Sequence, residues 1–203
     1  MSDTTDIGVG PHPQPWPDDG RLDPALLENG DTRNVEDRFR YWRIDAIKDE
    51  LQRTSAPLEV AIENWQHDRN IGTIVRTANA FNVRRVHVIG RRHWNRRGAM
   101  VTDRYMDIVH HHTVDDFRDA VSGKRIVAVD NIPGARDISD VSLGVQSVLV
   151  FGGEGPGISD ELRAIADDVV MISQQGSTRS LNVGVAAGIV LYEWTRRQNT
   201  TKA

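Results

Sequence analysis

The fold is decided by a stretch near the C-terminus, Gly176-Ser177-Thr178-Arg179-Ser180-Leu181-Asn182-Val183-Gly184-Val185-Ala186-Ala187. A polar loop that begins with glycine changes here, within a few residues, into a helix rich in small residues. Ser180 and Asn182 stand at the junction, where the free backbone N–H groups of a helix N-terminus converge with side-chain donors. The stretch therefore predicts a ligand site at the start of the last helix. The alternative is that Ser180 and Asn182 only cap this helix, which both residue types favour.

A second segment of this kind is Asn70-Ile71-Gly72-Thr73-Ile74-Val75-Arg76-Thr77-Ala78, which follows an expected strand. Asn70 and Arg76 are less than two helical turns apart, so both side chains can reach the same crevice. The alternative is a helix-capping asparagine and a solvated arginine, since exposed charges are the norm.

The third segment is Phe151-Gly152-Gly153-Glu154-Gly155-Pro156-Gly157, in which glycine allows the backbone to approach a ligand closely. It is not a P-loop, because no Gly-Lys-Ser/Thr follows. Its G-x-G-x-G spacing also occurs in Rossmann-type methyltransferases, but there the motif follows the first strand, whereas here one strand and two helices remain. An ordinary glycine-rich turn between a strand and a helix is the remaining alternative.

In order and approximate spacing, the three segments resemble the motifs of the SpoU/TrmH family, within the SPOUT superfamily of RNA ribose methyltransferases. The resemblance covers roughly residues 57–197. It implies an α/β domain with a mainly parallel sheet flanked by helices, a C-terminal trefoil knot, a homodimer, and S-adenosyl-L-methionine as the cofactor. Many members have Ile-Pro-Met where this chain reads Ile172-Ser173-Gln174-Gln175-Gly176. This sequence most resembles that of tRNA guanosine 2′-O-methyltransferases that act on the D-loop.

The resemblance also implies roles for individual residues. The expected catalytic set is Arg76, Asn70, Glu154, Ser180 and Asn182. The expected cofactor-binding set is Gly152, Ile172, Leu181, Ser180 and Val129, with the backbone around Gly152, Ile172 and Leu181 holding adenine and ribose. Because an arginine with a pKa above about 12 is a poor base, we expect Arg76 to orient the phosphate and to stabilise the developing alkoxide.

These implications favour tRNA as the substrate. Ribosomal RNA and the tRNA wobble ribose remain alternatives within the same class of enzyme. A non-catalytic RNA-binding protein with the same fold is the alternative from another class, and the presence of Arg76, Glu154, Ser180 and Asn182 argues against it.

The composition is that of a cytoplasmic protein with one core and a tail. The 203 residues include no cysteine, which excludes disulfides and thiolate metal sites. No apolar stretch has the length of a membrane span, and the N-terminus is acidic, unlike a signal peptide. The net charge of −4 argues against indiscriminate binding of nucleic acid, but it allows a local basic patch.

The chain is expected to have three parts. Residues 1–24 hold most of the prolines and are expected to be disordered. Residues 25–56 form a helical extension with an amphipathic helix over 33–52, and residues 57–203 form the methyltransferase domain. In that domain we expect strands at 58–62, 86–89, 107–110, 125–129, 148–151 and 169–172, and helices at 70–81, at 115–121, from Ser159, and at 182–197. Strands that alternate with helices predict a parallel sheet, with ligands at the carboxyl ends of the strands.

A basic loop follows the expected strand at 86–89, and it carries His93 and Trp94 among arginines. Positive charge with an aromatic ring suits contact with phosphates and stacking on bases, although a solvated loop is the alternative. The residues expected to bind RNA are Arg91, Arg92, Arg96 and Arg97.

Two further patterns need an interpretation. The run His110-His111-His112 is not expected to bind a metal, because adjacent strand residues point to opposite faces of a sheet. In the last helix, the small residues Gly184, Ala187 and Gly188 recur on one side and predict close packing. In related enzymes the partner of this helix is the second subunit.

Overall fold

The computed structural model describes residues 8–65, 70–153 and 156–201. The chain divides into two compact units, residues 1–53 and residues 54–203. Within the described ranges, no helix combines the length and the hydropathy needed to cross a membrane.

The first unit contains helices α1 (Pro24–Asn29) and α2 (Ile44–Thr54) and a single 3-10 turn, η1 (Asp37–Phe39). Helix α1 begins after Asp23, whose carboxylate accepts a hydrogen bond from the backbone N–H of Ala25. It ends at Gly30, with φ of +90°, where a Cβ atom would lie 2.7 Å from the carbonyl oxygen of Val9. Only glycine fits this turn.

The proline-rich segment, for which we expected disorder, is hydrogen-bonded from Val9 onward. Val9 forms an antiparallel bridge with Asp31. The backbone N–H of His12 donates to the carbonyl of Leu27 at 2.8 Å. The expectation considered only the small apolar surface of this segment, whereas its order comes from backbone hydrogen bonds to residues 27–41. Residues 1–7 lie outside the described residues.

The single helix expected over residues 33–52 is wrong in its first half. Tyr41 has φ of +62°, which interrupts any helix, and α2 starts only at Ile44. The break is fixed by the fully buried carboxylate of Asp31, which accepts hydrogen bonds from the backbone N–H of Tyr41 and from the Arg33 guanidinium. Burial raises the pKa of Asp31, but these hydrogen bonds outweigh it and lower the pKa to about 2.

The second unit is built on a seven-stranded sheet with the order β3-β2-β1-β6-β4-β7-β5, and all of its pairings are parallel. The strands are β1 (Ala56–Asn64), β2 (Val83–Gly90), β3 (Ile108–His111), β4 (Arg125–Val129), β5 (Arg136–Asp137), β6 (Ser147–Phe151) and β7 (Asp168–Met171). The expected fold class is therefore confirmed. Each expected strand is present, and only the two-residue β5 was missed.

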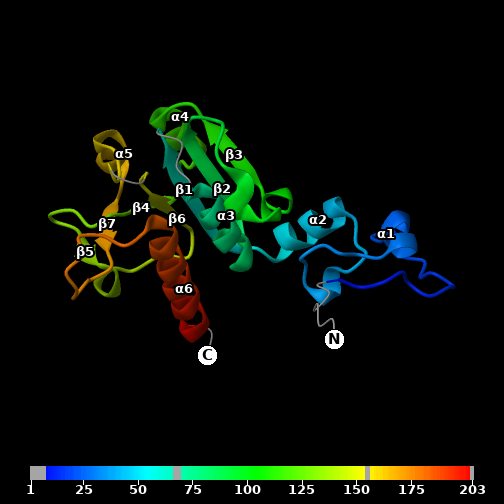
Figure 1. Ribbon diagram of the computed structural model, residues 1–203. Coiled ribbons are helices and arrows are strands. Elements are labelled where there is room, and N and C mark those ends of the chain that lie inside the picture. Colours follow the sequence, from blue (N-terminus) through cyan, green and yellow to red (C-terminus); the bar gives the residue numbers. More distant parts are fainter. Residues whose placement is uncertain (1–7, 66–69, 154–155, 202–203) are drawn as a thin grey trace. The chain divides into compact units, whose positions relative to one another are not determined.

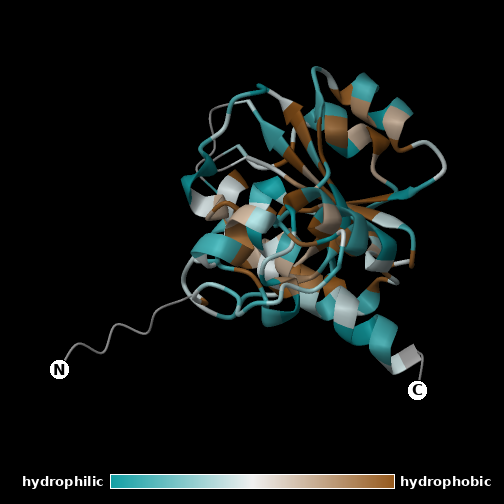
Figure 2. Cartoon of the chain, turned by 90° about the vertical axis from the view of Figure 1, so that its right-hand side faces the viewer, coloured by the Kyte–Doolittle hydropathy of each residue, from teal (hydrophilic) through white to brown (hydrophobic). Residues whose placement is uncertain are grey.

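Helices cover both faces of the sheet, with α3 (Ile71–Ala80) and α6 (Val183–Thr201) side by side on one face (Figure 1). Helices α4 (Val114–Ala120) and α5 (Asp160–Ile165) cover the other face. Alternate residues of β6 divide between the two cores: Leu149 packs toward α3 and α6, and Val150 packs toward α4 and α5. The hydrophobic colour accordingly concentrates between the layers in Figure 2. This layering makes the carboxyl ends of the central strands available for a site.

The short helices of this unit have side-chain caps. The hydroxyl of Ser159 accepts a hydrogen bond from the backbone N–H of Leu162 and caps α5, the helix expected from this residue. Thr113 and Asp116 form a reciprocal capping box at the start of α4. The trefoil knot remains a prediction.

Candidate cofactor and catalytic site

A cavity of about 360 Å³ lies beyond the carboxyl ends of β4, β6 and β7, against the first turn of α6. Every residue of the expected cofactor-binding set lines it, and so does Asn182. The lining residues are Val129, Asp130, Asn131, Phe151, Gly152, Gly153, Gly157, Met171, Ile172, Gln174, Ser180, Leu181, Asn182, Val183 and Ala186. Residues from three strand ends and two loops therefore meet in one place.

The floor of the cavity requires glycine at position 152. A Cβ atom there would lie 2.1 Å from the carbonyl carbon of Gly157 and 2.3 Å from the backbone nitrogen of Ile158. Gly153 and Gly157 form a bridge that folds this loop back on itself. The glycines thus allow one backbone segment to approach another closely. Glu154, expected in the catalytic set, lies outside the described residues.

Asn182 connects the cavity with α3. Its Oδ1 atom accepts hydrogen bonds from the backbone N–H groups of Gly184 (2.9 Å) and Val185 (3.3 Å), so it caps α6. Its Nδ2 atom donates to Oδ1 of Asn70 at 2.9 Å. Capping and a place in the site were alternatives for Asn182 in the sequence, and in the structure the residue caps α6 and also lines the cavity.

Asn70 and Arg76 do not line the cavity, but they lie on the helix to which Asn182 is joined. The side chain of Asn70 makes no capping hydrogen bond to α3, so the capping alternative for Asn70 is wrong. Arg76 is exposed, and no hydrogen bond or ion pair joins its guanidinium to another described residue. Ser180 is exposed, and its hydroxyl caps no described helix. The side chains of Arg76 and Ser180 are therefore both accessible to a ligand.

The small residues of α6 pack closely, as expected, but their partner is α3 of the same chain. A Cβ atom on Gly184 would lie 3.0 Å from Cγ2 of Thr73, and one on Gly188 would lie 4.0 Å from Cγ2 of Thr77. Within this chain the small side of α6 is therefore occupied by α3, and the contact of this helix with a second subunit remains a prediction. The outward side of α6 instead exposes Val185, Ile189 and Tyr192.

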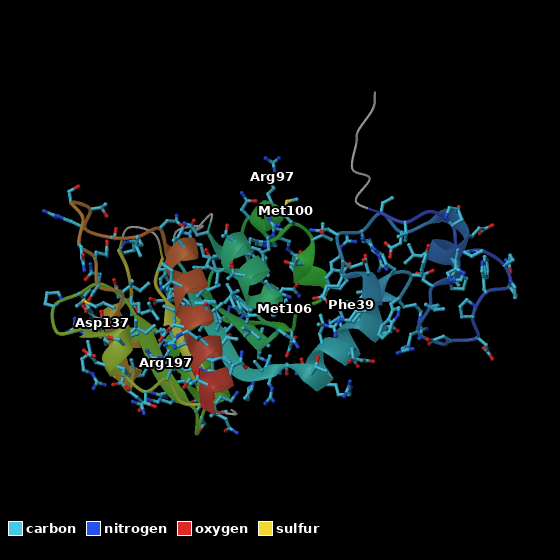
Figure 3. The ribbon with its side chains drawn as sticks, turned by 90° about the horizontal axis from the view of Figure 1, so that it is seen from below. Phe39, Arg97, Met100, Met106, Asp137 and Arg197 are labelled. Atoms are coloured by element: carbon cyan, nitrogen blue, oxygen red, sulfur yellow. The ribbon has the colours of Figure 1, made fainter. Side chains whose placement is uncertain are left out.

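The arginine loop is attached to the first turn of α3. The side-chain amide of Asn64 donates to the carbonyls of Arg91 and His93, at 2.6 and 3.1 Å. A Cβ atom on Gly72 of α3 would lie 2.8 Å from the backbone nitrogen of Ala99, so the loop and the helix touch through backbone. The four arginines expected to bind RNA are all exposed, and Figure 3 shows Arg97 extending away from the ribbon. Exposed arginines thus stand beside the helix that carries Arg76.

Charge is distributed unevenly between the two units. Residues 1–53 hold twelve Asp or Glu and seven Lys or Arg, whereas residues 54–203 hold 17 and 18. The net negative charge belongs to the first unit, and the second is nearly neutral. A local cluster of exposed arginines can therefore make a positive field beside α3.

Trp94 is not free to stack on an RNA base, contrary to our expectation. It is partly buried and packs against the core, and the Arg96 guanidinium lies 5.6 Å from the centre of its ring. Arg96 also pairs with Asp103 at 3.3 Å. Trp94 therefore holds the loop in place, and stacking on an RNA base is not supported.

The histidines form a buried chain on the α4 side of the sheet. Nε2 of His111 lies 2.8 Å from Nδ1 of His87, whose Nε2 lies 3.0 Å from a carboxylate oxygen of Glu59. Lys124 donates to the other oxygen of Glu59 at 2.6 Å. Burial and the nearby charge of His87 lower the pKa of His111 to about 4. Burial raises the pKa of Glu59, but its two partners outweigh this and lower it to about 2.

The sequence analysis missed two cavity residues with polar side chains at the end of β4, Asp130 and Asn131. They directly follow an expected buried strand, and the rule that ligands lie beyond the carboxyl ends of strands could have identified them. They belong to none of the three motifs.

Comparison with known proteins identifies the family. The model of the SpoU rRNA Methylase family matches residues 57–192. A tRNA (guanosine(18)-2′-O)-methyltransferase of Escherichia coli K12 is 31% identical over 166 residues, which cover 79% of this chain and 71% of that protein.

Solved structures agree. The TrmH/SpoU tRNA modifying enzyme of A. aeolicus superposes with a TM-score of 0.68 at 28% identity, covering 79% of this chain and 84% of that one. An AdoMet-bound rRNA methyltransferase from Sinorhizobium meliloti superposes with a TM-score of 0.62 at 26% identity, covering 72% and 60%. The chain thus belongs to the SpoU family of RNA methyltransferases.

Proposed function

We propose that this protein transfers a methyl group from S-adenosylmethionine to the 2′-hydroxyl of a ribose in tRNA. The observation that carries the proposal is the hydrogen bond between Asn182 and Asn70, because it joins the cavity to the helix that bears Arg76. The tRNA substrate rests on the E. coli relative, which is named for guanosine 18 of tRNA. We place the activity in the cytoplasm.

The residues of the cavity fit the proposed cofactor. Its volume, about 360 Å³, lies within the range of small-molecule sites, roughly 300–1,000 Å³. Apolar side chains of Val129, Ile172 and Leu181 suit the faces of an adenine ring, and backbone groups at the strand ends can hydrogen-bond its edge. No side chain fits at Gly152, because a Cβ atom there would meet the backbone of Gly157 and Ile158.

When bound, S-adenosylmethionine supplies a methyl group activated by its sulfonium, so the chain has to align the ribose and accommodate charge. Arg76 orients a phosphate of the RNA and stabilises the negative charge that develops on the 2′-oxygen. Asn70, held by Asn182, and the Ser180 hydroxyl position the ribose. The proton leaves to the phosphate or to water, because arginine is too weak a base to accept it.

Four further features complete the proposal. Arg91, Arg92, Arg96 and Arg97 contact RNA phosphates outside the catalytic set. The exposed apolar face of α6, with Val185, Ile189 and Tyr192, is the contact with a second copy of the chain in a homodimer. The C-terminal segments form the trefoil knot of the family, and Glu154 belongs to the catalytic set.

The test is methyl transfer to unmodified tRNA transcripts with tritiated S-adenosylmethionine, with ribosomal RNA assayed in parallel. Mass spectrometry of nuclease fragments then locates the methyl group. A ribose methyl at one tRNA nucleotide supports the proposal, and a methyl placed only on ribosomal RNA would reassign the substrate. Binding of tRNA without transfer to either RNA would refute the activity.

A further inference from the structure

Residues 130–137, which follow β4, belong to none of the three motifs. Their side chains nevertheless hold both loops that form the sides of the cavity. The loop at 152–158 follows β6, and the loop at 172–182 follows β7. Most residues of the second loop are exposed, so little packing holds that loop in place. What fixes them in place therefore determines the shape of the cavity.

Asp130 holds the first loop. Its Oδ2 atom accepts a hydrogen bond from the backbone N–H of Ile158 at 2.8 Å. Its own backbone N–H donates to the carbonyl of Val170 in β7 at 3.0 Å, so the anchor is itself fixed to the sheet. Gly157 has φ of +70°, and a Cβ atom there would lie 2.4 Å from Oδ2 of Asp130. This contact depends on glycine.

Asn131 holds the second loop. Its Nδ2 atom donates to the main-chain carbonyl oxygen of Arg179 at 2.9 Å, across 48 residues of sequence. Within the described part of the chain, this is the one hydrogen bond that joins residues 174–181 to any other segment. Inside the loop, the Thr178 hydroxyl donates to the carbonyl of Ser180 at 2.8 Å. The position of Ser180 and Leu181 in the cavity wall therefore depends on Asn131.

Asp137 fixes the beginning of the same loop from the end of β5. Its carboxylate accepts hydrogen bonds from the backbone N–H of Ser173, at 3.2 Å, and from the Ser173 hydroxyl. Hydrogen bonds from Ser139 and Ser173 hold the pKa of Asp137 well below its usual range. The label in Figure 3 shows this residue on the β5 side of the sheet. Among the described residues, Asn131 makes the one hydrogen bond that holds the loop between this anchor and Asn182.

We infer that Asn131 is a positioning residue for the cofactor, which acts by holding the main chain at Arg179 so that the wall of the cavity is formed before the cofactor binds. A loop that must be ordered at the moment of binding lowers affinity, because the cost of ordering is subtracted from the binding free energy. The inference rests on the cofactor site proposed above. It assigns a role to a residue outside the three motifs.

The test is Asn131→Asp, which keeps the shape of the side chain but replaces the donor with a carboxylate facing a carbonyl. We expect the dissociation constant for S-adenosylmethionine, measured by calorimetry, to rise about 3- to 12-fold, the equivalent of one hydrogen bond. The KM for the cofactor should rise in parallel. The KM for tRNA should stay within about twofold of wild type.

Two controls separate positioning from general loss of folding. Arg179→Ala should leave the dissociation constant unchanged, because Asn131 binds the main-chain oxygen and not the side chain. Asn131→Ala removes the donor without adding charge, and it should reproduce the weakened binding with an unchanged melting temperature, since the side chain is exposed. A merely structural defect would instead lower kcat by reducing the folded fraction and leave the dissociation constant intact.

The outcomes distinguish the inference from the function on which it rests. Wild-type protein that does not bind S-adenosylmethionine would refute the proposed function. Wild-type protein that binds, together with Asn131→Asp and Asn131→Ala that bind equally well, would overturn the inference alone.

Discussion

Asn182→Asp separates the two tasks that one side chain performs. Asn182 caps α6 with its Oδ1 atom and holds Asn70 with its Nδ2 atom. Aspartate keeps an oxygen for the cap, and its negative charge is favourable at a helix N-terminus. It cannot donate to Asn70, and it places a carboxylate oxygen against the amide oxygen of Asn70. The substitution therefore breaks the connection to α3 while keeping the helix.

The magnitudes follow from these contacts. Asn182→Asp should change the free energy of unfolding by less than about 0.5 kcal/mol, because Asn and Asp are equivalent caps. Asn182→Ala loses the cap and should cost about 1 kcal/mol, which lowers the melting temperature of a chain of this size by about 2–4 °C. Both variants release Asn70, and a displacement of about 1 Å at a reacting centre can cost about 100-fold in rate. We expect kcat to fall about 10- to 100-fold in both.

The assay is initial-rate methyl transfer at saturating S-adenosylmethionine and tRNA, with melting temperature measured on the same preparations. Loss of activity without loss of stability in Asn182→Asp supports the connection between the cavity and α3. Asn182→Asp with a wild-type rate would refute it, and so would a loss of rate that simply follows the loss of stability across the two variants.

Three further predictions follow from charge and packing. The pKa of His111 is about 4 in the folded protein and about 6.5 in the unfolded protein, so the unfolded state binds a proton first as the pH falls. Urea unfolding should therefore show that this group makes the protein about 2 kcal/mol less stable at pH 5 than at pH 7. His111→Asn should remove this component, whereas Glu59, with a pKa of about 2, loses its own contribution only below about pH 4.5; an unchanged pH dependence would contradict the assignment. Ile189→Glu should convert a dimer to a monomer by light scattering, Asn199→Glu at an exposed position of the same helix should not, and a wild-type protein that is active as a monomer would contradict the dimer. The last prediction replaces the loop arginines Arg91, Arg92, Arg96 and Arg97 with glutamine. The slope of tRNA affinity against salt should fall by the equivalent of about three phosphate contacts, while cofactor affinity stays the same. An unchanged slope would show that the loop is only solvated.

The sheet could be predicted from the sequence because each central strand is a short apolar run bounded by polar or turn residues. Strands β4 and β6 illustrate this. Almost all of their residues are buried, so apolar residues follow one another without alternating with polar ones. Strand β5 could not be found, because two residues carry no periodicity. The interruption at Tyr41 depends on a buried carboxylate ten residues away, which no local pattern reports.

The sequence was enough to predict which residues lie in the site, but not which hydrogen bonds and packing contacts join them. The motifs identified the residues around Gly152 and Leu181, and the cavity brings them together. The double use of Asn182 depends on a residue 112 positions earlier in the chain. The small side of α6 was correctly expected to pack closely, but its partner, α3, is a matter of tertiary arrangement. Asn131 escaped attention because a lone asparagine after a strand is an ordinary turn residue.

The central claim is that a cofactor held by the two loops delivers a methyl group to a tRNA ribose aligned by Arg76. It is tested most directly by following tritium from S-adenosylmethionine into tRNA with wild-type protein and Arg76→Ala, together with cofactor affinity for both. We predict one ribose methyl group per tRNA with the wild type, and almost none with Arg76→Ala despite near-native cofactor affinity. Full turnover by Arg76→Ala, or a methyl group found on a base instead of a ribose, would contradict the account.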